Sequence, residues 1–251
     1  MRRFGLIGHP LGHSFSQAYF NEKFKNEHLD CIYQNFDLES IGLLEKLISE
    51  NPDLKGFNIT IPYKEAVLPF LDELDDTANE VKAVNTVKVL DDGRMKGFNT
   101  DVIGFETTIA PILASRNALL PIEEKALILG TGGASKAVQY VLHKHNIDFQ
   151  IVSRNSQRGN LTYKMLTPEI IKDHLLIINA TPLGTYPKVD EAPDLSYEAI
   201  TPNHTLIDLI YNPEETLFLQ HGKQQRALTI NGLTMLYAQA EASWKIWNAK
   251  Q

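Results

Sequence analysis

Two short polar segments contain the residues best suited to move a proton. Lys64 ends the segment 56–64 (GFNITIPYK), and Asp101 ends the segment 97–101 (GFNTD). An ammonium and a carboxylate at such positions can donate, accept or orient a proton in a reacting substrate. A glycine-rich turn, 130–135 (GTGGAS), follows about thirty residues after Asp101. Because a turn of this kind can hold a dinucleotide, the order of the motifs predicts redox chemistry on a carbonyl or an alcohol.

The glycine-rich turn has the sequence context of a dinucleotide-binding site. An apolar strand is expected before it, at 125–129, and a helix after it, at 134–145. Small residues let the backbone approach a pyrophosphate, which the N-terminus of the helix then binds. Ser135 stands at the third position of the pattern, where Gly or Ala is usual. An ordinary strand–turn–helix is the alternative interpretation.

The end of the next expected strand, 149–153, distinguishes between two cofactors. NAD sites often place Asp or Glu here to hold the ribose hydroxyls. This strand instead ends at Ser153 and continues with Arg154, and Arg158 is close behind. A guanidinium presents a planar fork that matches a phosphate, whereas a carboxylate would repel one. We therefore expect NADP, with a solvated surface arginine as the alternative.

The other polar candidates also have structural interpretations. Lys64 follows Pro62 at the start of an expected helix, where most lysines are solvent-exposed. Asp101, taken alone, fits a helix-capping residue. Ser14 and Ser16 fit the N-cap and the first turn of a helix. They fit equally well a pair of hydroxyls that binds a carboxylate at a helix N-terminus.

The composition is that of an acidic globular protein. The chain has 251 residues, enough for one large or two small domains, with 43% hydrophobic residues and a formal charge of −7. This charge disfavours nucleic acid and anionic membranes as partners. No segment approaches the roughly 20 apolar residues of a membrane span, and the apolar stretch near the N-terminus is too short for a signal peptide. Cys31 is the only cysteine, so we expect a reducing, cytoplasmic compartment.

Metal binding is not expected. His9 and His13 have i,i+4 spacing, but the intervening residues 10–12 (PLG) exclude a regular helix that would bring both rings to one face. Loop packing is the simpler interpretation of both histidines.

Strands that alternate with helices predict an α/β fold with parallel or mixed sheets. In the first hundred residues, helices are expected after Ser14, around 41–48 and from Pro62, and strands at 4–7, 32–36, 54–61, 84–90 and 95–98. The last two strands flank 91–94 (DDGR), a hairpin signal. Thr100 is expected to cap a helix that runs past Ile112. After the glycine-rich turn, strands are expected at 149–153, 175–179, 205–209 and 227–230, and a last helix from about Gly232 with Tyr237 and Trp244 on its apolar face.

Taken together, the motifs resemble one family, the shikimate dehydrogenases (the shikimate/quinate dehydrogenase family). Segment 8–16 is similar to that family's substrate-carboxylate loop, and segments 58–64, 84–86 and 99–101 are similar to its substrate and catalytic segments. Segments 130–134 and 153–154 are similar to its NADP site, and 179–184, 208–213 and 232–239 to its later blocks. The resemblance covers almost the whole chain in the right order.

The resemblance implies a role for each matching residue. Lys64 and Asp101 would form the catalytic pair, in which either member can serve as the formal acid. Ser14 and Ser16 would bind the substrate carboxylate. Ring hydroxyls would be bound by Thr60, Asn85 and Gln239, and Tyr211 would lie near the substrate. Cofactor contacts would come from Gly130, Gly132, Gly133, Ala134, Ser153, Arg154 and Arg158, with Gly232 and Met235 bordering the nicotinamide.

The resemblance also implies a fold and an activity. It predicts two α/β domains with a cleft between them. Residues 1–100 plus 232–251 would be a substrate-binding and catalytic domain with a mainly parallel sheet, and residues 101–231 a Rossmann NADP-binding domain. The protein, a monomer or a homodimer, would be an NADP-dependent oxidoreductase that reversibly reduces 3-dehydroshikimate to shikimate in the shikimate pathway of chorismate and aromatic amino acid biosynthesis. The alternatives are a quinate or dual quinate/shikimate dehydrogenase and, less favoured, a non-catalytic NADP-binding sensor.

Four residues depart from the family's usual pattern. Gln17 stands where Pro is usual, which predicts a less rigid loop around Ser16. Lys136 replaces Arg, Asn155 replaces Thr, and Thr185 replaces Met. None of these changes removes a group that the chemistry needs.

Overall fold

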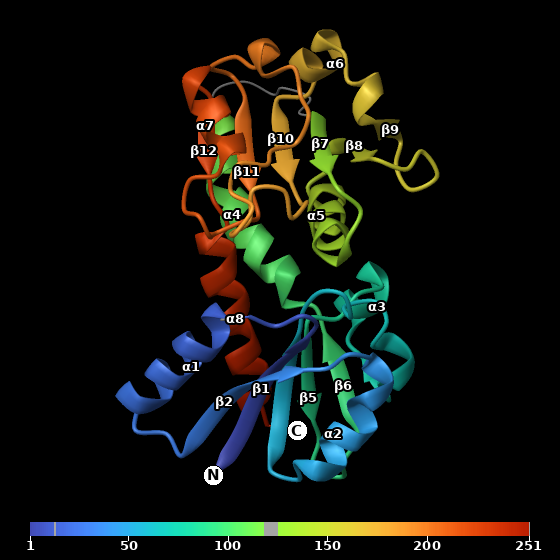
Figure 1. Cartoon of the computed structure of the whole chain (residues 1–251), viewed down its shortest axis with the longest axis vertical. Coiled ribbons are helices and arrows are strands. Elements are labelled where there is room, and N and C mark those ends of the chain that lie inside the picture. The colour runs from blue at the N-terminus through green and yellow to red at the C-terminus, as the bar shows by residue number, and fades with distance from the viewer. Residues whose placement is uncertain (13, 118–124, 251) are drawn as a thin grey trace. The chain divides into compact units, whose positions relative to one another are not determined.

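The computed structural model describes residues 1–12, 14–117 and 125–250 (Figure 1). The chain forms two compact units. The first unit comprises Met1–Thr100 with Gln239–Gln251, and the second unit comprises Asp101–Ala238. Each unit is built around one six-stranded sheet. None of the helices in the described part of the chain has the length and the apolar character needed to cross a membrane.

The first unit contains a mixed sheet in the order β2-β1-β3-β5-β6-β4 (Figure 1). Its strands are β1 (Arg2–Gly8), β2 (Cys31–Asp37), β3 (Leu54–Ile59), β4 (Glu73–Leu74), β5 (Thr86–Val89) and β6 (Met95–Phe98). β1 runs parallel to β2 and β3, whereas β5 runs antiparallel to β3 and β6. The predicted hairpin is therefore confirmed, and only the two-residue strand β4 escapes the sequence pattern.

Helices cover both faces of this sheet. They are α1 (Phe15–Asn26), η1 (Ile41–Leu43), α2 (Leu44–Glu50), η2 (Leu68–Phe70), α3 (Asp76–Val81) and the part of α8 (Leu233–Asn248) that belongs to this unit. Phe4 of β1 packs with α1 and α8 in a buried aromatic cluster that includes Trp247. Ile7 of the same strand packs with Phe57 and with Leu44 of α2. This alternation follows from the two-residue period of a strand and gives the sheet two buried faces.

The segment after β3 forms a turn, and the helix predicted from Pro62 is wrong. The backbone carbonyl of Lys64 accepts a hydrogen bond from the Val84 N–H at 2.7 Å. In an α-helix, the Leu68 N–H would donate to the Lys64 carbonyl. Here it donates to the Glu65 carbonyl at 3.3 Å, as a 3₁₀ turn does, and η2 begins at Leu68. Strand β3 also ends two residues earlier than predicted.

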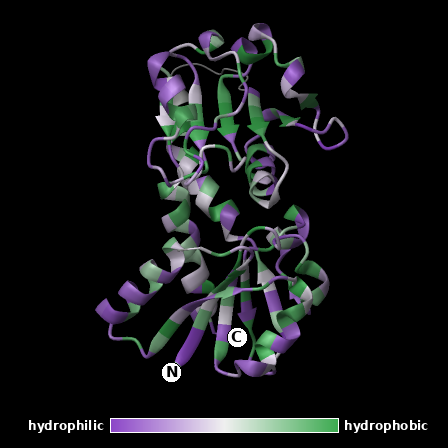
Figure 2. Cartoon of the chain, viewed as in Figure 1, coloured by the Kyte–Doolittle hydropathy of each residue, from purple (hydrophilic) through white to green (hydrophobic). Residues whose placement is uncertain are grey.

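The second unit contains a fully parallel sheet in the order β12-β11-β10-β7-β8-β9. Its strands are β7 (Lys125–Leu129), β8 (Asp148–Ser153), β9 (Leu161–Thr162), β10 (Leu176–Asn179), β11 (Thr205–Asp208) and β12 (Leu228–Ile230). Counted from β7, this is the 3-2-1-4-5-6 order of doubly wound dinucleotide-binding folds, and it reverses between β7 and β10. Figure 2 shows the central strands as hydrophobic, as expected for a parallel sheet that is covered on both faces.

The helices of the second unit are α4 (Thr100–Asn117), α5 (Gly133–Lys144), η3 (Tyr163–Met165), α6 (Pro168–Asp173), η4 (Tyr197–Ala199), α7 (Leu217–Gln224) and the start of α8. α5 packs against β7 and β8, and α7 packs against β11 and β12. α4 begins at Thr100 itself, one residue earlier than a cap at that position implies. In α8, Trp244 packs against the buried aromatic cluster, as predicted for the apolar face, whereas Tyr237 is exposed.

Candidate active site

Ser14, Ser16, Thr60 and Asn85, predicted to bind the substrate, lie in segments that adjoin one edge of the sheet of the first unit. The carboxyl ends of β1, β2 and β3 meet there because these strands are parallel, and β5 begins there because it is antiparallel to β3. The Thr60 N–H donates to the Ile7 carbonyl at 2.9 Å, and the His9 N–H donates to the Ile61 carbonyl at 3.1 Å. These bonds join the segments that leave the sheet at this edge, a place where α/β proteins commonly bind ligands.

Ser14 caps α1, as its structural interpretation predicts. Its hydroxyl accepts from the Gln17 N–H at 3.1 Å and donates to the side-chain oxygen of Asn35 at 2.9 Å. Gln17 thus supplies an N–H that the family's usual proline lacks. Ser16 lies in the first turn of α1, where its hydroxyl interacts with the phenol of Tyr33. Both hydroxyls therefore lie at a helix N-terminus, a position suited to an anion.

Lys64 is partly buried in the turn that follows β3. Its carbonyl is bonded to Val84, which directly precedes Asn85. The bond ties the turn that carries Lys64 to the start of β5, so Lys64 and Asn85 share one hydrogen-bonded frame.

Asn85 joins β5 to the first turn of α4. The side chain is buried, and its oxygen accepts from the Thr100 N–H at 2.7 Å and from the Thr100 hydroxyl at 3.1 Å. A backbone N–H can only donate, so the oxygen of the carboxamide must face Thr100 and the NH2 group must face away from it. Asn85 thereby satisfies a donor at the N-terminus of α4. Asp101, 5% exposed, follows in the first turn, where the helix dipole favours a carboxylate.

Four buried polar side chains form a cluster close to this edge that sequence reasoning misses. Asn58, Thr86, Thr100 and Ser243 hydrogen-bond to one another within the first unit. Ser243 also donates to the carbonyl of Gln239, one turn earlier in α8, at 2.9 Å. The first three residues lie inside matched motifs, whereas Ser243 is signalled only by its i,i+4 spacing from Gln239.

The glycine-rich turn of the second unit connects β7 to α5 at the edge where the strand order reverses. Gly130 has a φ of +109°, and a Cβ there would lie 3.0 Å from the Ala180 carbonyl oxygen, so glycine is required. Gly132 is the N-cap of α5, and no atom of the described residues beyond its chain neighbours lies within 4 Å of the position of a Cβ. Together with residues 133–134, this open helix N-terminus fits a pyrophosphate. Ser135 donates to the Gly130 carbonyl at 2.8 Å, which gives this departure a structural role.

Two arginines are exposed after the carboxyl end of β8. Arg154 directly follows Ser153, which is buried and accepts a hydrogen bond from the Asn155 N–H at 3.1 Å. Arg158 lies in the same loop, and residues 149–168 include no Asp or Glu. The loop therefore carries positive charge that suits a phosphate.

A buried carboxylate organises the ends of β10 and β11. Asp208 accepts hydrogen bonds from the Asn179 amide at 3.0 Å, the Thr216 hydroxyl at 2.5 Å and the Ile210 N–H at 3.0 Å. Burial raises the pKa of Asp208 to about 6, and these bonds oppose the rise. The Ile210 bond fixes the chain just before Tyr211, whose pKa is raised by burial. Asp208 thus holds together the ends of β10 and β11. It lies in segment 208–213, which resembles the family, but the sequence does not indicate this role.

Gly232 and Met235 lie where the chain enters α8. A Cβ at Gly232 would collide with the Leu209 carbonyl, and the Gly232 N–H donates to the Ile210 carbonyl at 2.9 Å. The close approach of the segment that follows β11 therefore requires glycine at position 232. The Met235 side chain is buried.

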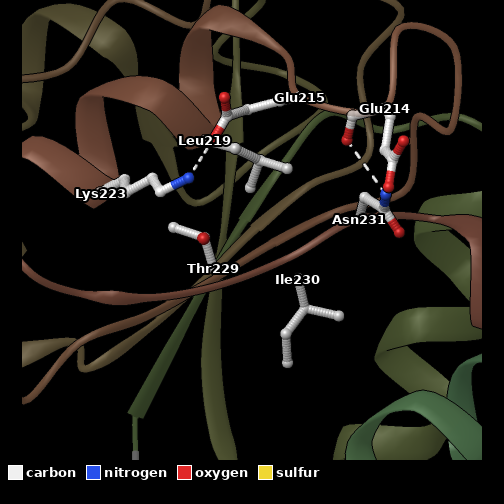
Figure 3. Close-up of a pocket in the computed structure, with 7 residues that line it drawn as sticks. All are labelled: Glu214, Glu215, Leu219, Lys223, Thr229, Ile230 and Asn231. Atoms are coloured by element: carbon white, nitrogen blue, oxygen red, sulfur yellow. Dashed lines mark hydrogen bonds and ion pairs between the residues drawn. The ribbon is translucent and has the colours of Figure 1, made fainter.

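A surface hollow beside the edge strand β12 contains none of the predicted site residues (Figure 3). Four of the residues that line it are joined in two pairs. Lys223 pairs with Glu215 at 3.0 Å, and the Asn231 amide donates to the Glu214 carbonyl at 3.0 Å. The hollow therefore gives no reason to place a ligand there.

Among the described residues, no group of three or more His, Cys, Asp or Glu side chains could hold a metal ion. His9 pairs with Asp37, with its Nδ1 2.7 Å from the carboxylate, and this hydrogen bond lowers the pKa of Asp37. His13 lies outside the described residues.

The chain is similar to one family of enzymes over nearly its whole length. Residues 6–87 match the family model described as the shikimate dehydrogenase substrate binding domain. A relative from Methanosphaera stadtmanae named shikimate dehydrogenase (NADP(+)) is 36% identical, over 98% of this chain and 91% of the relative. The chain belongs to the shikimate dehydrogenase family. The resemblance carried by the motifs is therefore confirmed.

Solved structures in the family share the fold. The shikimate 5-dehydrogenase of Thermus thermophilus, in complex with NADP(H) and shikimate, is 31% identical with a TM-score of 0.82, over 99% of this chain and 94% of that one. A quinate dehydrogenase from Corynebacterium glutamicum, in complex with NAD, is 26% identical with a TM-score of 0.86, over 98% and 93% of the two chains. The predicted α/β fold with two domains, one of them a Rossmann domain, is confirmed.

Proposed function

We propose that this chain is an NADP-dependent shikimate dehydrogenase that reversibly reduces 3-dehydroshikimate to shikimate in aromatic amino acid biosynthesis. The observation that carries the proposal is that hydrogen bonds join the segments that contain Lys64, Asn85 and Asp101. The turn of Lys64 is bonded to the start of β5, and Asn85 is bonded to the start of α4, which carries Asp101. Segments that carry unrelated surface residues would not need to be joined by such hydrogen bonds.

We assign substrate binding and catalysis to residues 1–100 with the terminal helix from residue 232, and cofactor binding to residues 101–231. Support comes from the carboxyl edges of the two sheets. In the first unit this edge gathers hydroxyl, amide and ammonium groups, and in the second it gathers the glycine-rich turn and the two arginines.

In this assignment, Lys64 supplies the proton that the substrate's carbonyl oxygen needs. Bound NADPH supplies a hydride to the carbonyl carbon. The Lys64 ammonium stabilises the negative charge that develops on the oxygen and transfers a proton to it, which leaves a neutral amine and the product hydroxyl. Asp101 orients the ammonium and a ring hydroxyl.

The substrate is an anion, although the protein is acidic. Ser14 and Ser16 can bind its carboxylate through hydroxyl and backbone N–H groups without a cation, with the Ser14 hydroxyl exchanging its bond to Asn35 for one to the carboxylate. Thr60, Asn85 and Gln239 then bind the ring hydroxyls. Because the side-chain oxygen of Asn85 is bonded to Thr100, Asn85 acts toward the ring as a hydrogen-bond donor.

The cofactor is NADP in this proposal. Gly130, Gly132, Gly133 and Ala134 approach the pyrophosphate at the N-terminus of α5. Arg154 and Arg158, beside Ser153, bind the additional phosphate that distinguishes NADP from NAD. Gly232 and Met235 border the nicotinamide, and Tyr211 lies near the substrate.

A spectrophotometric assay tests the proposal. Purified protein is mixed with shikimate and NADP, and the absorbance of NADPH is followed. We expect turnover with shikimate and NADP and a lower kcat/KM with quinate or with NAD. An equal or higher kcat/KM with quinate would favour the quinate or dual-substrate alternative, and NADP binding without turnover of either compound would favour the sensor.

We also propose a cytoplasmic location and a monomeric or homodimeric state. The single cysteine is the support for a reducing compartment. Size-exclusion chromatography with light scattering separates the two oligomeric states.

A further inference from the structure

Ser243 lies at the centre of a hydrogen-bond cluster that the proposed roles leave unexplained. Its side chain is fully buried in α8, one turn after Gln239. The hydroxyl donates its single proton to the Gln239 carbonyl at 2.9 Å. Its oxygen then accepts from the Asn58 amide at 2.9 Å and lies 2.8 Å from the Thr86 hydroxyl.

Thr86 extends this cluster toward α4. Its hydroxyl oxygen lies 3.0 Å from the Thr100 hydroxyl and 3.3 Å from the side-chain oxygen of Asn85. Asn85 in turn accepts from the Thr100 N–H. Because Ser243 donates its proton to Gln239, Thr86 donates to Ser243 and can accept from the Thr100 hydroxyl. A set of hydrogen bonds therefore runs from the backbone of Gln239 through Ser243 and Thr86 to Thr100, the first residue of α4, whose N–H is bonded to Asn85.

Asn58 fixes the orientation of the cluster. Its amide nitrogen donates to the Asn85 carbonyl at 3.1 Å, and a carbonyl can only accept. The side-chain oxygen of Asn58 therefore faces the other way, where it accepts from the Tyr33 hydroxyl at 2.8 Å. Because Tyr33 interacts with Ser16, the cluster also reaches the hydroxyls proposed to bind the substrate carboxylate.

We propose that Ser243 and Thr86 are positioning residues for recognition of the substrate ring. They hold the turn of α8 that carries Gln239 at a fixed spacing from Thr100 and from Asn85, which directly precedes β5. This inference rests on the proposed function, in which Gln239 and Asn85 bind the ring hydroxyls. Hydrogen bonds in a buried, low-dielectric site suit this positioning role. Loss of one partner leaves another buried polar group without a hydrogen bond, which is costly, so the native arrangement of the cluster is favoured.

Paired substitutions separate positioning from general stability. Thr86→Val keeps the side-chain shape and removes the hydroxyl, Thr86→Ser keeps the hydroxyl, and Ser243→Ala removes the second hydroxyl. Thr108→Val is a matched control, because Thr108 is a buried residue of α4 outside the cluster whose hydroxyl donates to the Gly104 carbonyl at 3.0 Å. For each purified variant, the measurements are kcat, the KM for shikimate, the Kd for NADP and the midpoint of thermal unfolding. A shikimate analogue that lacks one ring hydroxyl serves as a second substrate.

Thr86→Val and Ser243→Ala should raise the KM for shikimate about ten-fold and leave the Kd for NADP unchanged. The preference for shikimate over the deoxy analogue, measured as a ratio of kcat/KM values, should fall by a similar factor because the donors for the missing hydroxyl are displaced. Thr86→Ser should stay within about two-fold of the wild type in both quantities. Thr108→Val should lower the unfolding midpoint and leave the KM and the preference unchanged.

The inference is overturned if Thr86→Val lowers only the unfolding midpoint, as the Thr108 control does. If Ser243→Ala does not fold, the Thr86 pair decides, since valine and serine each preserve part of the native side chain. Wild-type protein that neither binds nor oxidises shikimate rejects the proposed function together with this inference. Wild-type protein that oxidises shikimate, with equal KM values for Thr86→Val and Thr86→Ser, rejects this inference alone.

Discussion

Lys64 and Asp101 are positioned by different means. Lys64 projects from a turn that is held through its own backbone carbonyl, whereas Asp101 is fixed by the first turn of α4, whose first N–H is bonded to Asn85. The lysine is thus carried by a turn of the first unit, and the carboxylate by the N-terminus of a helix, where the helix dipole favours its negative charge.

Lys64→Ala should lower kcat by roughly 10² to 10⁴, the usual effect of removing a positioned acid. The Kd for NADP should change little, because Lys64 belongs to the first unit and the glycine-rich turn to the second. Steady-state kinetics and a fluorescence titration with NADPH measure the two quantities. Lys46→Ala is the control, because Lys46 is an exposed lysine of α2 that pairs with Glu50. Near-normal turnover by the Lys64 variant would contradict the assignment.

Arg154→Ala should weaken NADP binding by roughly ten- to a hundred-fold, because a charge-assisted hydrogen bond contributes about 1.5–3 kcal/mol. NAD binding should stay nearly unchanged, since NAD lacks the additional phosphate. Calorimetric titrations with both cofactors give the two Kd values. Arg94→Ala controls for loss of an exposed guanidinium, because Arg94 pairs with Asp92 and Glu73 in the first unit. Equal weakening of both cofactors would make Arg154 a structural residue.

Single residues could be predicted from the sequence where the motif around them is local. Ser14 is confirmed as a cap because its partner, Gln17, lies three positions away. Ser243 could not be predicted, because its partner Asn58 lies 185 positions away in the chain and the two meet only in the folded protein. Its partners depend on the packing of α8 against β3 and β5, which no local pattern encodes.

At the scale of elements, strands were easier to predict than the segments between them. The expected strands of both sheets form, because apolar residues of the central strands are buried in the two cores. The helix expected from Pro62 fails for a non-local reason, since the Lys64 carbonyl accepts a hydrogen bond from Val84, in the segment that precedes β5. A proline at a helix start is a local preference, and a tertiary hydrogen bond overrides it.

The two glycines at helix entries should respond differently to alanine. Gly132→Ala should not affect stability, because the glycine has a φ of −81° and a Cβ would point into open space. It should nevertheless weaken NADP roughly ten- to a hundred-fold, since the methyl group would displace the pyrophosphate from charge-assisted bonds at the N-terminus of α5. Gly232→Ala should instead lower the free energy of unfolding by about 1–3 kcal/mol, because its Cβ would collide with the Leu209 carbonyl.

Urea denaturation and NADP titration of both glycine variants check these outcomes. A stable Gly132→Ala variant with normal NADP affinity would remove the pyrophosphate from this turn. A Gly232→Ala variant as stable as the wild type would show that the segment after β11 can move away from α8.

At the scale of the whole molecule, the two units place their functional segments by the same rule. In each sheet, parallel strands bring loops that are distant in sequence to one carboxyl edge. The alternation of strands and helices predicts parallel pairing, and hence this edge, from sequence alone. The order of the strands is a tertiary property, so the pairing of β7 with β10 and the contact of Asn179 with Asp208 could not be read from the chain.

Asp208 should make the stability of the molecule depend on pH in a direction opposite to that of most carboxylates. Its pKa is about 6 in the folded protein, against 3.8 as the ordinary value, because burial disfavours the charge. The folded state therefore binds the proton more tightly than the unfolded state. The stabilisation is fully present below the unfolded pKa and is lost as the pH rises through about 6.

Asp208→Asn isolates this effect, because asparagine keeps the shape of the side chain and does not titrate between pH 4 and 8. The free energy of unfolding of the wild type minus that of the variant should fall by about 2 kcal/mol between about pH 4.5 and about pH 7.5. Taking the difference cancels the titration of the other carboxylates, and Tyr197, the titratable group that senses Asp208, remains protonated because burial raises its pKa. Urea denaturation at a series of pH values gives the two curves. Parallel curves across this range would mean that Asp208 is ionised throughout, with its hydrogen bonds to Asn179, Thr216 and Ile210 outweighing the cost of burial.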